Sequence, residues 1–135
     1  MGWFDVHAHL TDSRLLAMEQ DVTARAMAAG VTTIISNGLN PIDNQAVHAL
    51  SMRQPIVKPA FGLYPVDAVL PEMDALGIEY PRETEPVPAE DAIQWVRDHL
   101  DDCVAVGEIG LDHYWVPESL WARQEQVFIA LVSLA

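Results

Sequence analysis

The sequence predicts an α/β protein of the (β/α)8 TIM-barrel family, with about four βα units, which is half of a barrel. Strand-like and helix-like segments alternate along the 135 residues, and this alternation is typical of parallel sheets. The predicted strands are nearly continuous apolar runs, as expected where both faces of a sheet are buried. No Gly-x-Gly-x-x-Gly pattern follows the first strand, which disfavours the competing dinucleotide-binding, doubly wound sheet.

The first elements are a strand, a helix and a second strand. Residues 3–7, WFDVH, are predicted to form the first strand. Residues 13–29 have the apolar spacing of a helix, and they are followed by Gly30, a common helix stop. Residues 31–36, VTTIIS, are rich in the β-branched side chains that favour strands, and we expect the second strand there.

The middle of the chain is marked by prolines. Asn40 followed by Pro41 is typical of a helix start, since asparagine caps the first turn and proline fits its first position. Residues 56–62, IVKPAFG, are predicted as the third strand, although Pro59 weakens that prediction. Residues 64–88 hold five of the nine prolines and many carboxylates. We expect a long surface excursion there, either a functional lid or rim or variable decoration.

The last predicted unit ends in an apolar helix. Residues 89–100 are predicted as a helix, residues 103–110, CVAVGEIG, as the fourth strand, and residues from 119 onward as the last helix. Residues 127–135 carry no charge, and a helix that is apolar all round is expected to be buried on several sides. A whole barrel needs about 250 residues. We therefore expect residues 1–135 to be a single domain, the first half of a barrel that ends in or just after its fourth helix.

Composition restricts the class of protein. The net charge is −13, with only seven Lys and Arg, which excludes a protein that coats nucleic acid through basic side chains. A phosphate substrate would need bound metal ions as local positive charge, whereas the simpler explanation of the acidity is solubility. No apolar run is long enough for a membrane helix. The lack of a signal-like N-terminus and the single Cys103 predict a cytoplasmic protein without a membrane partner.

The first strand carries three titratable groups at alternate positions, in the segment FDVHAHL. Alternate residues of a strand face the same side, so Asp5, His7 and His9 are expected to point into the barrel. The histidines lie toward the C-terminal end of the strand, where barrel active sites are found. Two imidazoles at this spacing can bind one metal ion, and Asp5 can orient one of them. The alternative is a set of solvated polar residues at a strand end.

Glu108 strengthens the metal hypothesis. It follows two apolar residues on the same face of the fourth strand, and a buried carboxylate without a partner is unfavourable. A metal ion shared with His7 and His9 would remove that penalty, and this set of ligands suits a hydrolytic site. A salt bridge to a lysine or arginine is the alternative. Asp112 and His113, on the loop that follows, are further candidates.

Four segments together resemble a known family. FDVHAHL, GLYP, AVGEIGLD and ARQEQVF are similar, in this order, to the N-terminal half of the TatD-type metal-dependent deoxyribonucleases, which are (β/α)8 hydrolases of the amidohydrolase-like group. The resemblance implies a site for divalent metal ions (Mg, Mn or Zn, with two in a complete barrel). It also implies hydrolysis of phosphodiester bonds, in DNA or a small substrate, by metal-activated water. His7 and His9 match the first metal-binding pair, and Glu108 matches a metal-binding catalytic glutamate.

The chain also departs from the family pattern. Many members have a histidine in a Gly-x-His-Pro segment, where this chain has Tyr64. The remaining ligands of the family, two histidines and an aspartate from strands five, six and eight, have no counterpart in these residues. His48 and His99 lie on predicted helices, His48 at the surface and His99 near a helix C-terminus, where it can interact with the helix dipole. The resemblance therefore predicts family membership more directly than activity of this chain alone.

Two other functions stay open. Another amidohydrolase-type enzyme, acting on an ester, lactone or amide, shares the early His-x-His but would carry a carboxylated lysine where this chain has Glu108. A non-catalytic half-barrel would have two free strand edges, and free edges favour pairing with another chain. That second alternative predicts self-association or a partner that supplies the missing half-barrel.

Overall fold

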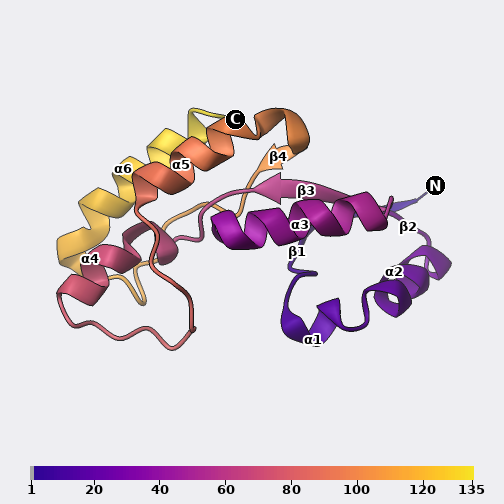
Figure 1. The fold of residues 1–135 in the computed structure, drawn as a ribbon, viewed down its shortest axis with the longest axis horizontal. Coiled ribbons are helices and arrows are strands. Elements are labelled where there is room, and N and C mark those ends of the chain that lie inside the picture. The colour runs from indigo at the N-terminus through magenta and orange to yellow at the C-terminus, as the bar shows by residue number, and fades with distance from the viewer. Residues whose placement is uncertain (1) are drawn as a thin grey trace.

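The chain folds into one parallel sheet whose four strands lie in the order β1-β2-β3-β4 (Figure 1). The structure, a computed structural model, describes residues 2–135. Its strands are β1 (Trp3–Ala8), β2 (Val31–Asn37), β3 (Val57–Phe61) and β4 (Ala105–Val106). Its α-helices are α1 (Ser13–Leu16), α2 (Glu19–Ala28), α3 (Pro41–Arg53), α4 (Leu70–Ala75), α5 (Ala89–Asp98) and α6 (Trp121–Val132). Short 3-10 helices are η1 (Asp67–Val69), η2 (Leu100–Asp102) and η3 (Glu118–Leu120).

Every pair of neighbouring strands is parallel, and helices connect each strand to the next. Parallel strands in sequential order with helical crossovers are the arrangement of a (β/α)8 barrel. The four strands curl into half of such a barrel, so the predicted fold class is confirmed. The start of α3 also follows its prediction, because the Asn40 side chain accepts a hydrogen bond from the Asp43 backbone N–H and Pro41 takes the first helical position.

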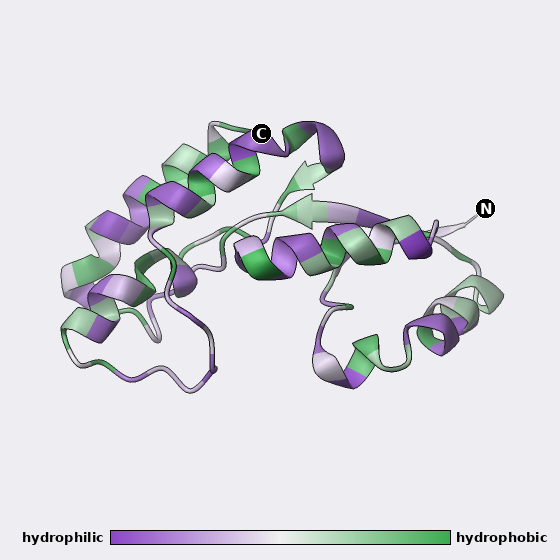
Figure 2. Ribbon diagram, in the orientation of Figure 1, coloured by the Kyte–Doolittle hydropathy of each residue, from purple (hydrophilic) through white to green (hydrophobic). Residues whose placement is uncertain are grey.

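The main hydrophobic core lies between β3 and three helices. Val47 of α3, Phe61 of β3, Val96 of α5 and Val127 of α6 are all buried in one cluster. Figure 2 shows that α3 and α5 each carry hydrophobic and hydrophilic residues, as expected of helices with one buried face. The burial of the last helix on several sides is not observed, since Ile129 on α6 is 56% exposed.

Strand β1 is much less buried than predicted. Trp3, Phe4 and Val6 are each more than 60% exposed, so neither face of this strand is fully covered. The reason is that β1 lies at an edge of the sheet and pairs with β2 alone. Within residues 2–135, no helix has the length and apolar character needed to cross a membrane.

Two elements are shorter than their predictions. The helix expected over residues 13–29 is divided into α1 and α2, because the backbone of Met18 leaves the helical conformation between them. The strand expected over residues 103–110 is reduced to Ala105 and Val106. Beyond Val106 the chain turns toward β2, where the Glu108 backbone N–H donates to the Gly38 carbonyl at 3.0 Å. This turn ends the strand early, and it sets the direction of Glu108.

The excursion predicted over residues 64–88 contains η1 and α4 before an irregular segment that leads to α5. Val66, Val69 and Met73 form a second buried cluster with Val116 from the segment after β4. The first part of the excursion is therefore packed structure, whereas residues 79–88 lie along the surface as an extended segment. Figure 1 shows this segment looping out below α4 and α5.

Candidate metal centre

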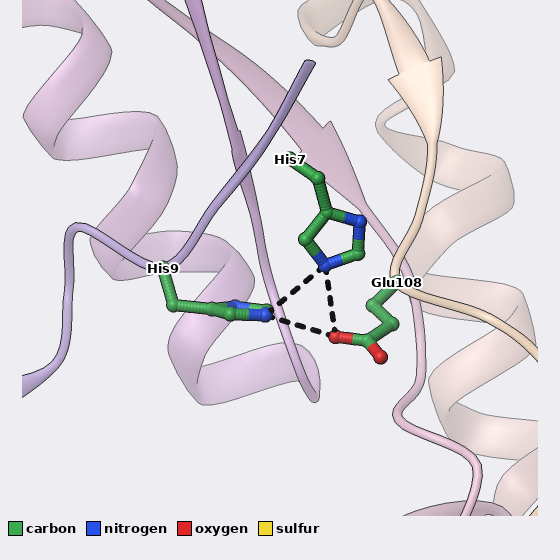
Figure 3. Close-up of side chains that lie close together, drawn as sticks. All are labelled: His7, His9 and Glu108. Atoms are coloured by element: carbon green, nitrogen blue, oxygen red, sulfur yellow. Dashed lines mark hydrogen bonds and ion pairs between the residues drawn. The ribbon is translucent and has the colours of Figure 1, made fainter. Parts of the chain in front are cut away.

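Three predicted ligands converge on one point (Figure 3). His7 lies on β1, His9 follows that strand, and Glu108 follows β4. The Nε2 atoms of His7 and His9 are 3.2 Å apart, and the Glu108 Oε2 atom lies 3.4 Å from His7 Nε2 and 3.0 Å from His9 Nε2. Two imidazole nitrogens and one carboxylate oxygen are therefore gathered around a common centre, an arrangement that could hold a divalent metal ion.

The tautomer of His9 is fixed by the hydrogen bond that its Nδ1 atom makes. His9 Nδ1 lies 3.0 Å from the backbone carbonyl oxygen of Asn37 at the end of β2. A carbonyl oxygen only accepts hydrogen bonds, so Nδ1 must carry the proton. In the neutral ring, Nε2 then directs its lone pair toward Glu108 and His7. A ligating histidine is normally held in this way by a carbonyl or carboxylate behind it, so the surroundings of His9 fit a metal ligand.

Glu108 is positioned by its own backbone. Its N–H donates to the Gly38 carbonyl after β2, and the Gly107 N–H donates to the Phe61 carbonyl at 2.9 Å. Gly62 lets the chain after β3 pass close by, because a Cβ atom at this position would lie 2.4 Å from the Glu108 carbonyl oxygen. These contacts attach Glu108 to the ends of β2 and β3. Together with His7 on β1, they tie the loop after β4 to the three other strands.

A buried glutamine joins three of the segments on which the family resemblance rests. Gln124 of α6 is fully buried, its Nε2 donates to the Pro65 carbonyl at 2.8 Å, and its Oε1 accepts from the Asp112 backbone N–H at 3.0 Å. Pro65 belongs to the GLYP segment, and Asp112 belongs to AVGEIGLD. The helix segment ARQEQVF therefore holds together the two loops beside the metal centre.

The other predicted residues do not join the ligand group. The Asp5 carboxylate accepts from the His7 backbone N–H at 3.2 Å rather than from an imidazole, so Asn37 and not Asp5 orients His9. The Asp112 carboxylate accepts from the backbone N–H groups of the next loop residues, Tyr114 and Trp115. His113 stacks on the Trp121 ring at 3.9 Å. In the part of the chain that the structure describes, the only group of three or more ligand residues is His7, His9 and Glu108.

The two helix histidines have structural roles. His99 caps the end of α5, where its Nδ1 lies 2.7 Å from the Trp95 carbonyl and its ring stacks on Trp95. This contact agrees with the predicted interaction at a helix C-terminus. His48 is half-buried against the Phe61 ring, at 6.0 Å between ring centroids, so the prediction that it lies at the surface holds only in part.

The ligand group opens into a large cavity of about 1390 Å³. His9 and Glu108 line one part of it, and Tyr64, Tyr80 and Arg82 line another. The walls come from the segments that follow β1, β2, β3 and β4, as expected for the active-site end of a barrel. Burial raises the pKa of Tyr64 to about 12, and contact with Tyr80 and the charge of Glu108 act in the same direction. Tyr64 is therefore a neutral hydroxyl group at neutral pH.

Comparison with known proteins agrees with this geometry. The family model described as TatD related DNase matches residues 4–135, which is nearly the whole chain. The chain belongs to the TatD-related DNase family. The family resemblance and the barrel fold predicted from the sequence are therefore confirmed.

The relatives are about twice as long as this chain. The 3′-5′ ssDNA/RNA exonuclease TatD of Citrobacter koseri is 30% identical over 135 residues, and the match covers 98% of this chain and 45% of that protein. The uncharacterized metal-dependent hydrolase YabD of Bacillus subtilis is 28% identical over 135 residues, with 98% and 46% covered. The crystal structure of YjjV, a TatD homologue from Escherichia coli, matches with a TM-score of 0.74 at 24% identity, over 98% of this chain and 46% of that one. The chain thus spans about half the length of the curated relatives it matches.

Three residues near the site were not singled out from the sequence. Asn37 acts through its backbone carbonyl, which leaves no signature in a side-chain pattern. Gln124 lies inside a quoted motif, and an amide on the otherwise apolar face of a helix could have marked it as a buried bridge. Arg82 is one of only seven basic residues, and its place among prolines and glutamates gave no reason to expect it in the cavity wall.

Proposed function

We propose that this chain provides one half of a TatD-type metal-dependent phosphodiesterase site, with DNA or a small phosphodiester as substrate. The observation that supports this most directly is the convergence of His7, His9 and Glu108, with the His9 tautomer set by Asn37. The sequence resemblance to the family matches the same three residues to its first metal-binding pair and a metal-binding glutamate.

The roles of the residues follow from their chemistry. His7 and His9 would hold a divalent ion through Nε2, and Glu108 would hold it through Oε2, with a second ion expected in a complete barrel. A bound ion supplies Lewis-acid polarisation of the phosphoryl oxygen and lowers the pKa of water. Asn37 keeps the His9 proton on Nδ1, so that Nε2 stays available. Tyr64, neutral at working pH, can donate a hydrogen bond toward the cavity.

The exposed edge of the sheet supports a second part of the proposal. β1 and β4 each pair with one strand only, and the apolar side chains of Trp3, Phe4 and Val6 are exposed on β1. Further βα units, either covalently joined or supplied by another copy or a partner, would cover these edges and add the remaining metal ligands. Hydrolytic activity is accordingly expected of a completed barrel, and metal binding is expected of this chain.

Metal binding is the direct test. Calorimetric titration with Mn²⁺ or Zn²⁺ should show one site, and the double variant His7→Ala with His9→Ala should weaken it by more than about 100-fold, because even loss of residues behind the ligands costs 10–100-fold. His113→Ala, which removes a histidine that stacks on Trp121, is the matched control and should bind as the wild type does. Unchanged affinity in the double variant would sink the proposal.

A further inference from the structure

The cavity has a second polar region besides the metal centre, formed by Tyr64, Tyr80 and Arg82. Arg82 comes from the extended part of the excursion, and its guanidinium carbon lies 5.1 Å from the centre of the Tyr64 ring and 5.9 Å from that of Tyr80. All three side chains line the cavity that His9 and Glu108 also line. We call these three residues the arginine–tyrosine subsite.

Arg82 is held in place by a buried carboxylate. Its Nη2 donates to Asp67, whose side chain is only 5% exposed. Asn40 donates to the other Asp67 oxygen and to the Thr84 hydroxyl, both at 3.2 Å, and this ties the extended segment to the start of α3. Burial disfavours the charged guanidinium, but the contact with Asp67 outweighs it and raises the pKa of Arg82. Arg82 is therefore a fixed, permanently charged group.

The guanidinium group keeps unused hydrogen-bonding capacity. An arginine offers five N–H donors, and Asp67 is bonded through a single nitrogen. The Nε atom is buried, so the donors that the guanidinium offers to the cavity belong to its terminal nitrogens, on a side chain that is 30% exposed. An arginine that is oriented by one carboxylate, with donors left over, is suited to bind a second planar or tetrahedral anion.

Charge makes this position unusual within the cavity. Five carboxylates line it: Asp12, Asp43, Glu83, Glu85 and Glu108. The only other cation of the lining is Arg14, which is 86% exposed and already bonded to Asp12 through two nitrogens. A polyanion that enters the cavity is therefore repelled by these carboxylates and attracted at Arg82, and an ion held by His7, His9 and Glu108 would add a second point of attraction.

We propose that the arginine–tyrosine subsite binds the phosphate and base of the nucleotide that flanks the scissile phosphodiester of a single-stranded nucleic acid. The combination is chemically specific, because arginine binds phosphate and aromatic rings stack on bases without regard to sequence. The inference deepens the proposed function, since it assumes that the scissile group lies at the metal centre. It assigns the excursion a role in holding the substrate and favours short or single-stranded ends over a duplex.

The test removes the charge of the subsite without changing the charge of the protein. The double variant Asp67→Asn with Arg82→Gln deletes one acid and one base, so the net charge stays at −13 and no buried carboxylate is left unpaired. Its control is Asp21→Asn with Arg25→Gln, which removes an exposed ion pair of α2 outside the cavity. The probe is a fluorescein-labelled thymidine tetranucleotide, followed by anisotropy in EDTA so that binding is measured without metal or cleavage.

The subsite predicts that affinity for the tetranucleotide falls in the Arg82 variants and not in the control. Affinity should fall at least about tenfold in Asp67→Asn with Arg82→Gln, and the slope of log affinity against log salt should decrease by about 0.7, the value for one phosphate contact on a single strand. The control should stay within twofold of the wild type. Arg82→Lys, which keeps a cation beside Asp67 but loses the planar fork, should show an intermediate loss. Urea unfolding of each variant checks that the fold is retained.

The result is separable from that of the metal titration. Equal affinities in both double variants, or no binding of the tetranucleotide by the wild type, would overturn the subsite, whatever the metal titration gives. If metal affinity survives the loss of His7 and His9 while the tetranucleotide still distinguishes the Arg82 variants, the proposed metal centre fails and the subsite stands. Metal affinity should be unaffected by Asp67→Asn with Arg82→Gln, because neither residue belongs to the ligand group.

Discussion

The two sides of the half-barrel differ sharply in packing. On one side, β3 is enclosed by α3, α5 and α6, and Phe61 is completely buried. On the other side, β1 lies open, and Phe4 is 69% exposed. The candidate metal centre takes His7 from the open strand, His9 from the segment just after that strand, and Glu108 from the loop after β4. The fold is therefore stabilised mainly by the packed side, away from the candidate metal centre. The positions of the three site residues depend instead on strand register and a few hydrogen bonds.

The sharpest way to test this contrast is to shorten one phenylalanine on each side. Phe61→Ala should lower the free energy of unfolding by about 3–5 kcal/mol, because it removes a fully buried ring and leaves a cavity beside Trp95 and His48. Phe4→Ala should change it by less than about 0.5 kcal/mol, since the ring is mostly in water already. Urea unfolding followed by circular dichroism measures both. Similar losses in the two variants would show that β1 is covered in solution and that the contrast is false.

The sequence predicted the packed side and the site with unequal success. On the packed side, the start of α3 follows from the Asn40–Pro41 pair, which is a local signal. The convergence of His7 and His9 follows from the two-residue period of a strand. The length of β4 was not predictable in the same way, because the strand ends where Glu108 bonds to Gly38, a contact between residues seventy positions apart.

The parts of the site that escaped prediction share a cause. Asn37 contributes a backbone carbonyl, and every residue has one. Arg82 enters the cavity because a buried Asp67 holds it there, and no sequence pattern predicts that these two residues pair. The exposure of β1 escaped for another reason, since its apolar composition is that of a covered strand, whereas its place at the edge of the sheet is set by tertiary structure. Local patterns therefore locate candidate ligands, and tertiary contacts decide which groups orient them.

A second prediction tests whether the packed side supports the site. Gln124→Ala should lower the free energy of unfolding by about 2 kcal/mol, because it leaves the Pro65 carbonyl and the Asp112 N–H without their partner. It should also weaken metal binding, since both loops border Glu108. Gln126→Ala, an exposed glutamine of the same helix, is the matched control and should do neither. If Gln124→Ala loses stability but keeps its metal affinity, the packed side does not support the metal centre.

The smallest expected effect appears only in alkaline solution and concerns Tyr64, which lies at the border between the two sides. Burial raises the pKa of this phenol in the folded protein from 10 to about 12. The folded state therefore keeps a proton that the unfolded state has released between these pH values. It follows that the contribution of Tyr64 to stability is constant below pH 10 and is lost as the pH rises toward 12.

Tyr64→Phe removes the titrating group, so its stability should decline less steeply from pH 10 to 12 than that of the wild type. The measurement is the urea midpoint at a series of pH values. Tyr114→Phe is the matched control, because Tyr114 is 85% exposed, and it should follow the wild-type curve. Parallel curves for the wild type and Tyr64→Phe would mean that the Tyr64 hydroxyl is open to solvent. The cavity wall beside the metal centre would then share the exposure of β1 instead of the burial of the packed side.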